Sequence, residues 1–409
     1  MAKLSAKSVL TVIKRILLGV ACTILSVIVL AIGTVLLLWG NEIRALLSFE
    51  MLLERDMQQL SGAVYSMHMP GGFYLDELLK NGGVSSDEEL IDFVVKKLAK
   101  GIVPLEMTAK DMIGCSSFTA QTPERDQLWG RNYDHRRTNV CIVRTNGGRG
   151  RHATITTADL QYVGIPTNRA VDGIMDKILC LAATYVPMDG INDAGVSCGI
   201  YSSYQQDLLP IPTDQQTEKP DITSSLLIRV ILDYADDLDE AIEIARSYDL
   251  HDSANSSFHY MVADASGRSA ILEWIVSDGP DNDGTKRELV ITYNDADEAL
   301  GSPAADHDFQ CVTNFIVASG YAENNPQRDL TCDRYPVLYE TLAATDGIVE
   351  DEQAAMELLR TVSRRTLKPT DLTHITVHSA VYNLTDRTVL WVAGEKYDDP
   401  AAVFEFGFK

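Results

Sequence analysis

The hydrophobic and polar positions divide the chain into an apolar start and a long mixed remainder. The run from Ile16 to Trp39 carries no charged residue. At about 1.5 Å of rise per helical residue, it is long enough to cross a hydrocarbon core of roughly 30 Å. This run therefore predicts a single membrane-spanning helix. A cleaved signal peptide is the competing interpretation, but its apolar region would be shorter and would end at a small-residue cleavage site.

The charges around this run are unequal. Four basic residues precede it, namely Lys3, Lys7, Lys14 and Arg15, whereas the far side opens with Glu42 and Arg44. A positive excess on one side of a span favours the cytoplasm for that side. The sequence thus predicts a cytoplasmic N-terminus at 1–15, an anchor in the cell membrane at 16–39, and an extracellular remainder.

The stretch 40–114 has mainly helical spacing. Apolar residues recur at helical intervals from Asn41 to about Leu60, and Ser86 and Glu89 stand in capping-box relation before a second apolar face. We expect a helical linker or propeptide here.

From Cys115 onward, short β-branched and aromatic runs alternate with helical segments. Hairpins are predicted with turns at Ala265–Arg268 and Leu384–Arg387, and two helices between Ser224 and Tyr248 with a break near Asp236. Further helices are expected from Arg334 to Ala344 and in the run EDEQAAMELLRTV. This order favours sheets layered with helices over a strict βαβ alternation.

Composition excludes several function classes. The net charge of -23 would repel nucleic-acid phosphates. The seven cysteines form no CxxC pair, zinc quartet or legible disulfide framework. There is no HExxH motif, and Asp278–Gly284 lacks the first acidic ligand and the closing glutamate of a calcium loop. We therefore expect neither a metal nor a cofactor.

One cysteine is distinguished by the residues downstream of it. Cys115 lies in IGCSSFTA, and a lone cysteine is more often buried and inert than reactive. Arg131 and Asp134 come later, in WGRNYDH. On a strand these two side chains point to opposite faces, so a joint role would need a bulge or turn at Asn132. A surface ion pair is the ordinary alternative.

The motifs GCSSF, LWGRNYDH, DGINDAGVSCGIY, HYMVADASGRSAILEW, CVTNF and LTCDRY occur in this order. The ordered set resembles the choloylglycine hydrolase family of N-terminal nucleophile amidases, which includes bile salt hydrolases and penicillin V acylases. The acyltransferase of penicillin synthesis and acid ceramidase are similar in plan. The resemblance implies an α+β fold, a four-layered αββα sandwich, with a catalytic domain at 115–409.

The resemblance also implies roles for six residues. Cys115 matches the N-terminal nucleophile, and Arg131 and Asp134 match the pair that holds its thiolate and free amine. Asn192 matches the asparagine on the oxyanion side. Asn314 matches the second asparagine and Arg334 the later arginine of the site. As alternatives, an asparagine often occupies a turn, and an arginine at a helix start often packs its aliphatic stem.

The chemistry suits these residue types. Once the Gly114–Cys115 bond is broken, the new amine, with a reference pKa near 7.7 to 8, can act as base for the thiol on the same residue. Arg131 would lower the pKa of the thiol, and amide donors would stabilise the oxyanion. We expect hydrolysis of a linear C–N amide bond of a small acyl amide, through a thioester.

Several alternatives remain open at this point. A cysteine–histidine dyad could use one of the histidines after Cys115, namely His135, His259, His374 and His378. The chain could also be an acyltransferase of the same fold or an inactive surface binding protein. The sequence leaves a homo-oligomer open and does not identify the acyl amide.

Overall fold

The computed structural model describes residues 6–56, 61–98, 100–101, 114–148, 150–203, 212–276, 286–294, 309–318, 334–371 and 373–408. The segment Asp278–Gly284, the first part of LTCDRY and the residues directly before Gly114 lie outside these ranges.

Two large sheets form the body. Within the described ranges, the first has nine strands, in the order β1 (Glu50–Leu53), β2 (Val64–Met69), β5 (Val140–Thr145), β6 (Thr154–Asp159), β7 (Pro187–Asn192), β8 (Ser197–Ser202), β11 (Phe258–Ala263), β12 (Ser269–Val276) and β13 (Arg287–Tyr293). The second has six, in the order β14 (Cys311–Val312), β3 (Gly114–Gln121), β4 (Gln127–His135), β15 (Ile375–Asn383), β16 (Thr388–Ala393) and β17 (Val403–Gly407). Neighbouring strands are antiparallel except β2 and β5, which run parallel.

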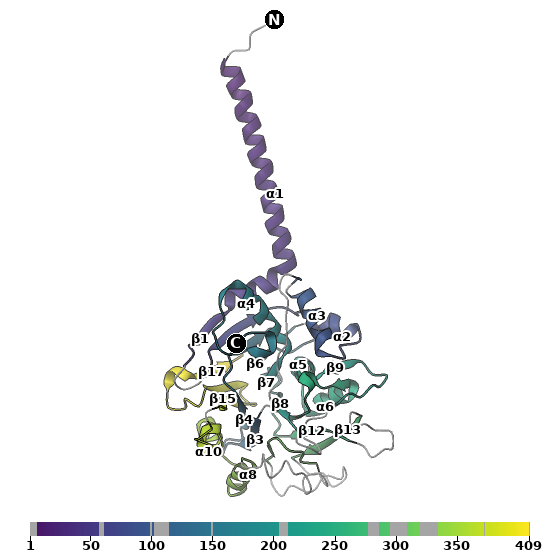
Figure 1. Ribbon diagram of the computed structural model, residues 1–409, viewed down its shortest axis with the longest axis vertical. Helices are drawn as coiled ribbons and strands as arrows, with labels where there is room; N and C mark the ends of the chain where they lie inside the picture. The colour runs from purple at the N-terminus through teal and green to yellow at the C-terminus, as the bar shows by residue number, and fades with distance from the viewer. Residues whose placement is uncertain are drawn as a thin grey trace.

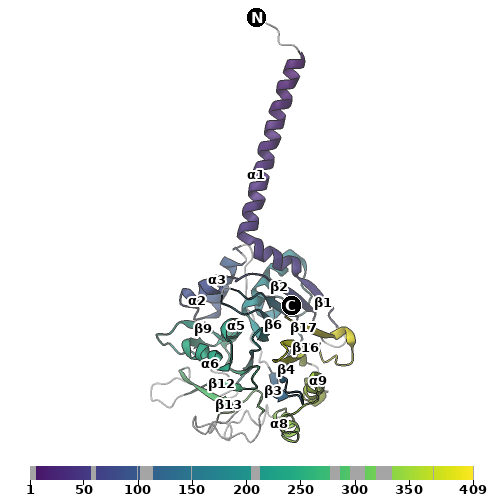
Figure 2. The same ribbon diagram turned by 180° about the vertical axis from the view of Figure 1, so that it is seen from behind.

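Helices cover the outer face of each sheet. On the first sheet α5 (Ser224–Tyr234) lies against β7 and β8, and α6 (Leu238–Ser247) packs on α5. On the second, α9 (Glu352–Thr361) lies against β4 and β15, flanked by α8 (Tyr335–Ala343) and α10 (Arg364–Leu367). Figures 1 and 2 show the sheets face to face between these two helical layers. The expected four-layered αββα sandwich is confirmed.

Burial follows from this layering. The strands β7, β8 and β15 are buried at every residue, because each lies between a facing sheet and a helical layer. The remaining elements in the described ranges are α2 (Leu75–Lys80), α3 (Asp87–Lys97), α4 (Gly173–Cys180), the two-stranded sheet of β9 (Asp221–Thr223) and β10 (Asp249–His251), and 3-10 helices at Leu160–Val163, Leu181–Tyr185, Ser253–Asn255 and Pro400–Ala402.

The predicted anchor is the outer part of a long helix. Helix α1 (Ala6–Ser48) stands away from the body, and its backbone departs from helical geometry at Trp39, where the apolar run ends (Figure 1). By length and composition the helix can cross a membrane, and a signal sequence would meet the same criteria.

The expectation of a helical stretch over 40–114 is wrong in part. The helix ends at Ser48, and residues up to Met69 include the strands β1 and β2. Tertiary pairing decides this, since β2 adds to β5 across a long separation in sequence. Helix α3 does begin at the predicted cap, where Ser86 Oγ accepts the Glu89 N–H at 3.3 Å.

The other predicted elements are present. Both hairpins turn where expected, between β11 and β12 and between β15 and β16. The break near Asp236 occurs because Asp237 caps α6, accepting the Glu240 N–H at 3.0 Å.

Candidate active site

Cys115 is held at three separate atoms. Its backbone N–H donates to Asn314 Oδ1 at 2.8 Å, and its carbonyl accepts from Arg334 Nη1 at 2.7 Å. Its Sγ lies 3.4 Å from Arg131 Nη2 and 3.7 Å from the Ile200 carbonyl. The side chain is fully buried.

The backbone of β3 explains why side chains can take the place of a strand here. Cys115 is opposite Tyr133 of β4, but its N–H and carbonyl bond to Asn314 and Arg334, on the side away from β4. On that side the pairing of β14 extends only to Ser117. At Cys115 this edge of β3 pairs with no strand of the described chain. The side chains of Asn314 and Arg334 bind its backbone instead.

Arg131 approaches the thiol from the space between the sheets. Its Nε donates to Asp189 Oδ2 at 2.8 Å and its Nη2 to the Ile200 carbonyl at 2.7 Å. The ring centroid of Tyr201 lies 4.5 Å from the guanidinium carbon. These contacts on three sides fix the orientation of the guanidinium.

The Asp189 carboxylate accepts hydrogen bonds from several side chains. Besides Arg131 it accepts from His378 Nε2 at 2.9 Å and from Tyr382 Oη at 2.6 Å. Burial opposes its charge, but His378 and Arg131 outweigh burial and hold the pKa of Asp189 well below its usual range. Burial likewise opposes the charge of Arg131, yet Cys115, Tyr201 and Asp189 raise its pKa. Both groups are therefore charged.

Arg131 lowers the pKa of the Cys115 thiol as expected, but in the uncut chain burial outweighs it. Burial raises the pKa of the Cys115 thiol from 9.0 to about 11, although Arg131 acts in the opposite direction. Asp134 and Asp189 add to the rise. With the preceding residues still attached, Cys115 is a protonated thiol at neutral pH.

Asp134 lies on the other face of β4 from Arg131, as strand alternation requires. Its Oδ2 accepts from Arg334 Nη1 at 2.8 Å and its Oδ1 from Thr376 Oγ1 at 2.6 Å. The expected bulge at Asn132 is not found: β4 pairs with β3 without a register shift, and the irregularity with β15 lies between Thr376 and His378. The two side chains bracket Cys115, with Arg131 at the thiol and Asp134 on the backbone side.

Asn314 and Arg334 complete the group. Arg334 Nη2 donates to Asn314 Oδ1 at 2.8 Å, and Asn314 Nδ2 donates to the Ser202 carbonyl at 2.9 Å. Five of the six predicted residues therefore lie together, although Asn314 and Arg334 follow β14 and precede α8, far from Cys115 in sequence.

Asn192 is the exception. Its Nδ2 donates to the carbonyls of Leu232 and Ala235 at 3.1 and 2.8 Å, and its Oδ1 accepts the N–H groups of Ala194 and Val196 at 3.1 and 2.9 Å. The amide is thus fully occupied in shaping the turn between β7 and β8. The structure does not bring Asn192 together with the other five residues.

Sequence reasoning missed a buried pair that holds the Asn314 segment. Glu273 accepts from His259 Nδ1 and the Val317 N–H, both at 2.9 Å, and from the Ala318 N–H at 2.8 Å. His259 Nε2 lies 2.8 Å from the Thr313 carbonyl. Both ring nitrogens thus face acceptors, and the ring links the Glu273 carboxylate to the backbone of the Asn314 segment.

Sequence reasoning also missed Asp189 and Tyr201, the partners of Arg131, and some of the missed residues carried a signal in the sequence. Asp189 interrupts the apolar run VPMDGI, and a carboxylate inside a buried strand needs a charged partner. His259 and Glu273 are directly paired across β11 and β12, as the hairpin register dictates. Tyr201 carries no comparable signal.

The histidine alternative finds no geometric support within the described ranges. The hydrogen bonds of Cys115 Sγ go to Arg131 and Ile200, and to no histidine. His378 is bound to Asp189, and His259 to Glu273 and Thr313.

A comparison with protein-family models matches residues 115–277 to "Linear amide C-N hydrolases, choloylglycine hydrolase family". The matched part of the chain belongs to the choloylglycine hydrolase family. The match begins at Cys115, and Asn314 and Arg334 lie beyond its end. The description of this family, linear amide C–N hydrolases, supports the expected amidohydrolase class for the matched residues.

Comparisons with solved structures give more distant likenesses. Penicillin V acylase from Agrobacterium tumefaciens shares 14% identity, with a TM-score of 0.41, over 68% of this chain and 83% of that one. A mutant of the conjugated bile acid hydrolase from Clostridium perfringens shares 14%, with a TM-score of 0.41, over 72% and 97%. The N-acylethanolamine-hydrolyzing acid amidase ortholog from Caenorhabditis elegans shares 14%, with a TM-score of 0.37, over 66% and 93%. No curated protein matches the chain by sequence.

Proposed function

We propose that this chain is a membrane-anchored amidohydrolase whose nucleophile, Cys115, is freed by cleavage of the Gly114–Cys115 bond. The observation that carries the proposal is that the N–H, carbonyl and Sγ of Cys115 each contact a different predicted site residue, at the first position of a linear amide hydrolase domain. A merely structural cysteine in a sheet needs none of these three side chains.

Removal of the residue before Cys115 would change its surroundings in the required direction. A Cβ on Gly114 would lie 3.0 Å from Asp134 Cβ and 3.5 Å from Asp134 Oδ2, so Gly114 itself lies close beside this carboxylate. After cleavage, the amine of Cys115 keeps Asn314 Oδ1 as an acceptor and gains room next to Asp134. Water can then reach the thiol, which weakens the burial that raises its pKa.

The reaction follows from these positions. The Cys115 amine takes the thiol proton, and Arg131 stabilises the thiolate. Sγ attacks the carbonyl carbon of the acyl amide, and Asn314 Nδ2 turns from the Ser202 carbonyl to donate to the oxyanion. The amine of Cys115 returns its proton to the leaving nitrogen, leaving a thioester. Water then attacks the thioester and releases the acid. One oxyanion donor of this kind is worth about 2.7 to 4 kcal/mol.

The membrane part of the proposal rests on α1 and the flanking charges. The basic residues before the apolar run favour a cytoplasmic N-terminus, with the hydrolase domain outside the cell. The substrate is a small acyl amide.

The test compares full-length wild type with Cys115→Ala and with Cys141→Ala, a buried cysteine on β5. Mass spectrometry should find a fragment beginning at Cys115 in wild type and Cys141→Ala, and none in Cys115→Ala. Only the two cleaved proteins should hydrolyse a member of a panel of conjugated bile acids, penicillin V, N-acyl amino acids and N-acyl ethanolamides. An uncut wild-type chain that hydrolyses no acyl amide refutes the proposal and favours a binding protein. Transfer of the acyl group to an added amine in preference to water would identify an acyltransferase.

A further inference from the structure

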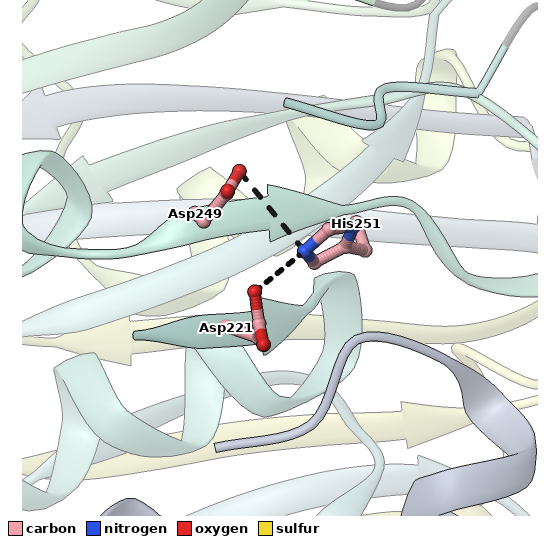
Figure 3. Close-up of side chains that lie close together, drawn as sticks. All are labelled: Asp221, Asp249 and His251. Carbon is pink, nitrogen blue, oxygen red and sulfur yellow. Dashed lines mark hydrogen bonds and ion pairs between the residues drawn. The ribbon is translucent and has the colours of Figure 1, made fainter. Parts of the chain in front are cut away.

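The short parallel pair of β9 and β10 gathers three potential metal ligands on one face. Asp221 is directly opposite Asp249 across the pair, and His251 lies two residues after Asp249, so its side chain points the same way. Figure 3 shows the two carboxylates, one from each strand, converging on the same ring nitrogen of His251.

The distances suit a single ion. His251 Nε2 lies 3.0 Å from Asp221 Oδ1 and 4.0 Å from Asp249 Oδ1. The three ligand atoms all lie within 4.8 Å of one another. Ligands at 2.0 to 2.2 Å from a tetrahedral zinc ion are separated by about 3.4 Å, so only small side-chain rotations are needed.

A second, independent observation comes from Asp249. Its side chain is 1% exposed, and its Oδ1 has no hydrogen-bond partner among the residues that the structure describes, while its other oxygen accepts the Thr217 N–H. A buried carboxylate oxygen without a partner is costly. This oxygen faces His251 Nε2 and lies where a cation would satisfy it.

The other ring nitrogen of His251 is already fixed. Nδ1 lies 2.8 Å from Asp214 Oδ1 and Nε2 lies 3.0 Å from Asp221 Oδ1, so both ring nitrogens face carboxylates; an ion bound at Nε2 would take the place of a proton there, with Nδ1 still held by Asp214. Nε2 is then directed at Asp221 and Asp249. A carboxylate that orients a histidine in this way is the usual second layer of a metal site.

We propose that Asp221, Asp249 and His251 bind one divalent transition-metal ion of the zinc class, with Asp214 orienting the histidine. A mixed nitrogen and carboxylate set favours such an ion over Mg²⁺ or Ca²⁺, which prefer oxygen ligands. The side chain of Asp221 is 41% exposed, so water can fill a fourth position and the ion can enter from solvent.

The ion would brace a junction between distant parts of the chain. The Asp221 N–H donates to the Gly82 carbonyl at 2.8 Å, and the Asp221 carbonyl accepts from Val84 at 3.3 Å. Gly83, between them, has φ of +83°, and a Cβ there would lie 1.8 Å from the Asp221 carbonyl oxygen. A metal that fixes Asp221 therefore also fixes the docking of the segment between α2 and α3. Sequence motifs could not reveal this site because its ligands come from two separate strands.

The test uses the full-length chain in detergent micelles after treatment with a chelator. Zn²⁺ binding is measured by competition with a chromogenic zinc indicator, and thermal unfolding is followed with and without Zn²⁺. We expect one Zn²⁺ per chain, a raised Tm, and at least a tenfold loss of affinity in Asp249→Asn and His251→Ala. Asp214→Asn should lose about 10- to 100-fold. Asp221→Asn, at an exposed position, provides a ligand variant that should fold even if Asp249→Asn does not.

The matched control is Asp193→Asn. His152 lies 2.7 Å from Asp193 through Nδ1 and 2.9 Å from Asp236 through Nε2, so these carboxylates sit on opposite ring nitrogens and cannot share an ion. This variant should bind Zn²⁺ like wild type. Co²⁺ substitution separates the site from the cysteines, because a site without thiolate lacks the strong near-ultraviolet sulfur band. The proposal is overturned if Zn²⁺ does not bind, if Asp221→Asn binds it as wild type does, or if the Co²⁺-substituted protein shows that band; His251 then only bridges the carboxylates through hydrogen bonds.

Discussion

The Glu273–His259 pair should control the position of Asn314, and Glu273→Gln tests this. Both side chains are fully buried, and Glu273 accepts three hydrogen bonds, two of them from the backbone of Val317 and Ala318. Glutamine has nearly the same shape but only one accepting oxygen. It can keep His259 and the Val317 N–H, but its own NH₂ then faces the Ala318 N–H.

The expected loss of stability can be assembled from these contacts. Leaving the Ala318 N–H buried against another donor costs about 1–3 kcal/mol. The two remaining bonds lose their charge assistance, which is worth about 1 kcal/mol each. The sum, roughly 3–5 kcal/mol, agrees with the cost of removing one partner from a buried ion pair. That is a large part of the stability of an ordinary domain.

Denaturant unfolding of the full-length chain measures this loss, and hydrogen exchange read by mass spectrometry over residues 313–318 locates it. The control is Asp233→Asn, which neutralises the buried Arg229–Asp233 pair on α5. Both variants should lose stability, but only Glu273→Gln should lose protection over 313–318 and hydrolyse substrate more slowly at equal amounts of folded protein. A loss below about 1 kcal/mol with unchanged protection would refute the assignment of this pair as the support of Asn314.

Two further predictions concern Cys115 and its neighbours. Because burial raises the pKa of its thiol to about 11 in the uncut chain, the neutral form persists at pH 8 and the thiolate fraction there is about 0.1%. Pulse labelling with iodoacetamide should therefore modify Cys115 far more slowly in uncut than in cleaved molecules of one sample. The labelling rate of the uncut form should rise about tenfold per pH unit between pH 8 and 10. Equal labelling rates of both forms at pH 8 would contradict this. Asn314→Asp keeps the acceptor but removes the Nδ2 donor, so kcat should fall about 10²- to 10³-fold, whereas Asn192→Asp, whose amide holds a turn, should lower stability more than kcat in the folded protein. Equal kcat losses in the two variants would show that Asn314 has no special role.

Sequence reasoning succeeded where the determining contacts are local. The turn at Ala265–Arg268 and the break at Asp236 were predicted because turn and capping residues stand beside alternating or helical apolar runs. It failed for β1 and β2, since the apolar spacing of this stretch also fits a helix and only pairing with β5 selects a strand.

The same distinction holds within the site. Motif order located Cys115, Arg131 and Asp134, which lie on the adjacent strands β3 and β4. The motif DGINDAGVSCGIY does not show which of its residues lies at the site. The register of β7 and β8 decides this: Asp189 and Tyr201 lie next to Arg131, whereas Asn192, at the end of β7, holds the turn that follows. A partner supplied by the facing sheet has no signature in the linear sequence.

The position of β2 bears on the product of the proposed cleavage. The strand lies between β1 and β5, and it pairs with β5 in parallel register from Val64 with Val140 to Met69 with Thr145. Ala63, before the cleavage site, makes two hydrogen bonds to residues after it: its N–H donates to Asn139 Oδ1 at 3.0 Å, and its carbonyl accepts from the Val140 N–H at 3.0 Å. Loss of 1–114 would expose the edge of β5 and the buried side chains that pack on β2, which is unfavourable in water. Cleavage before Cys115 would therefore leave two chains in one folded unit, and the hydrolase domain would stay attached to the helix α1 through the sheet itself.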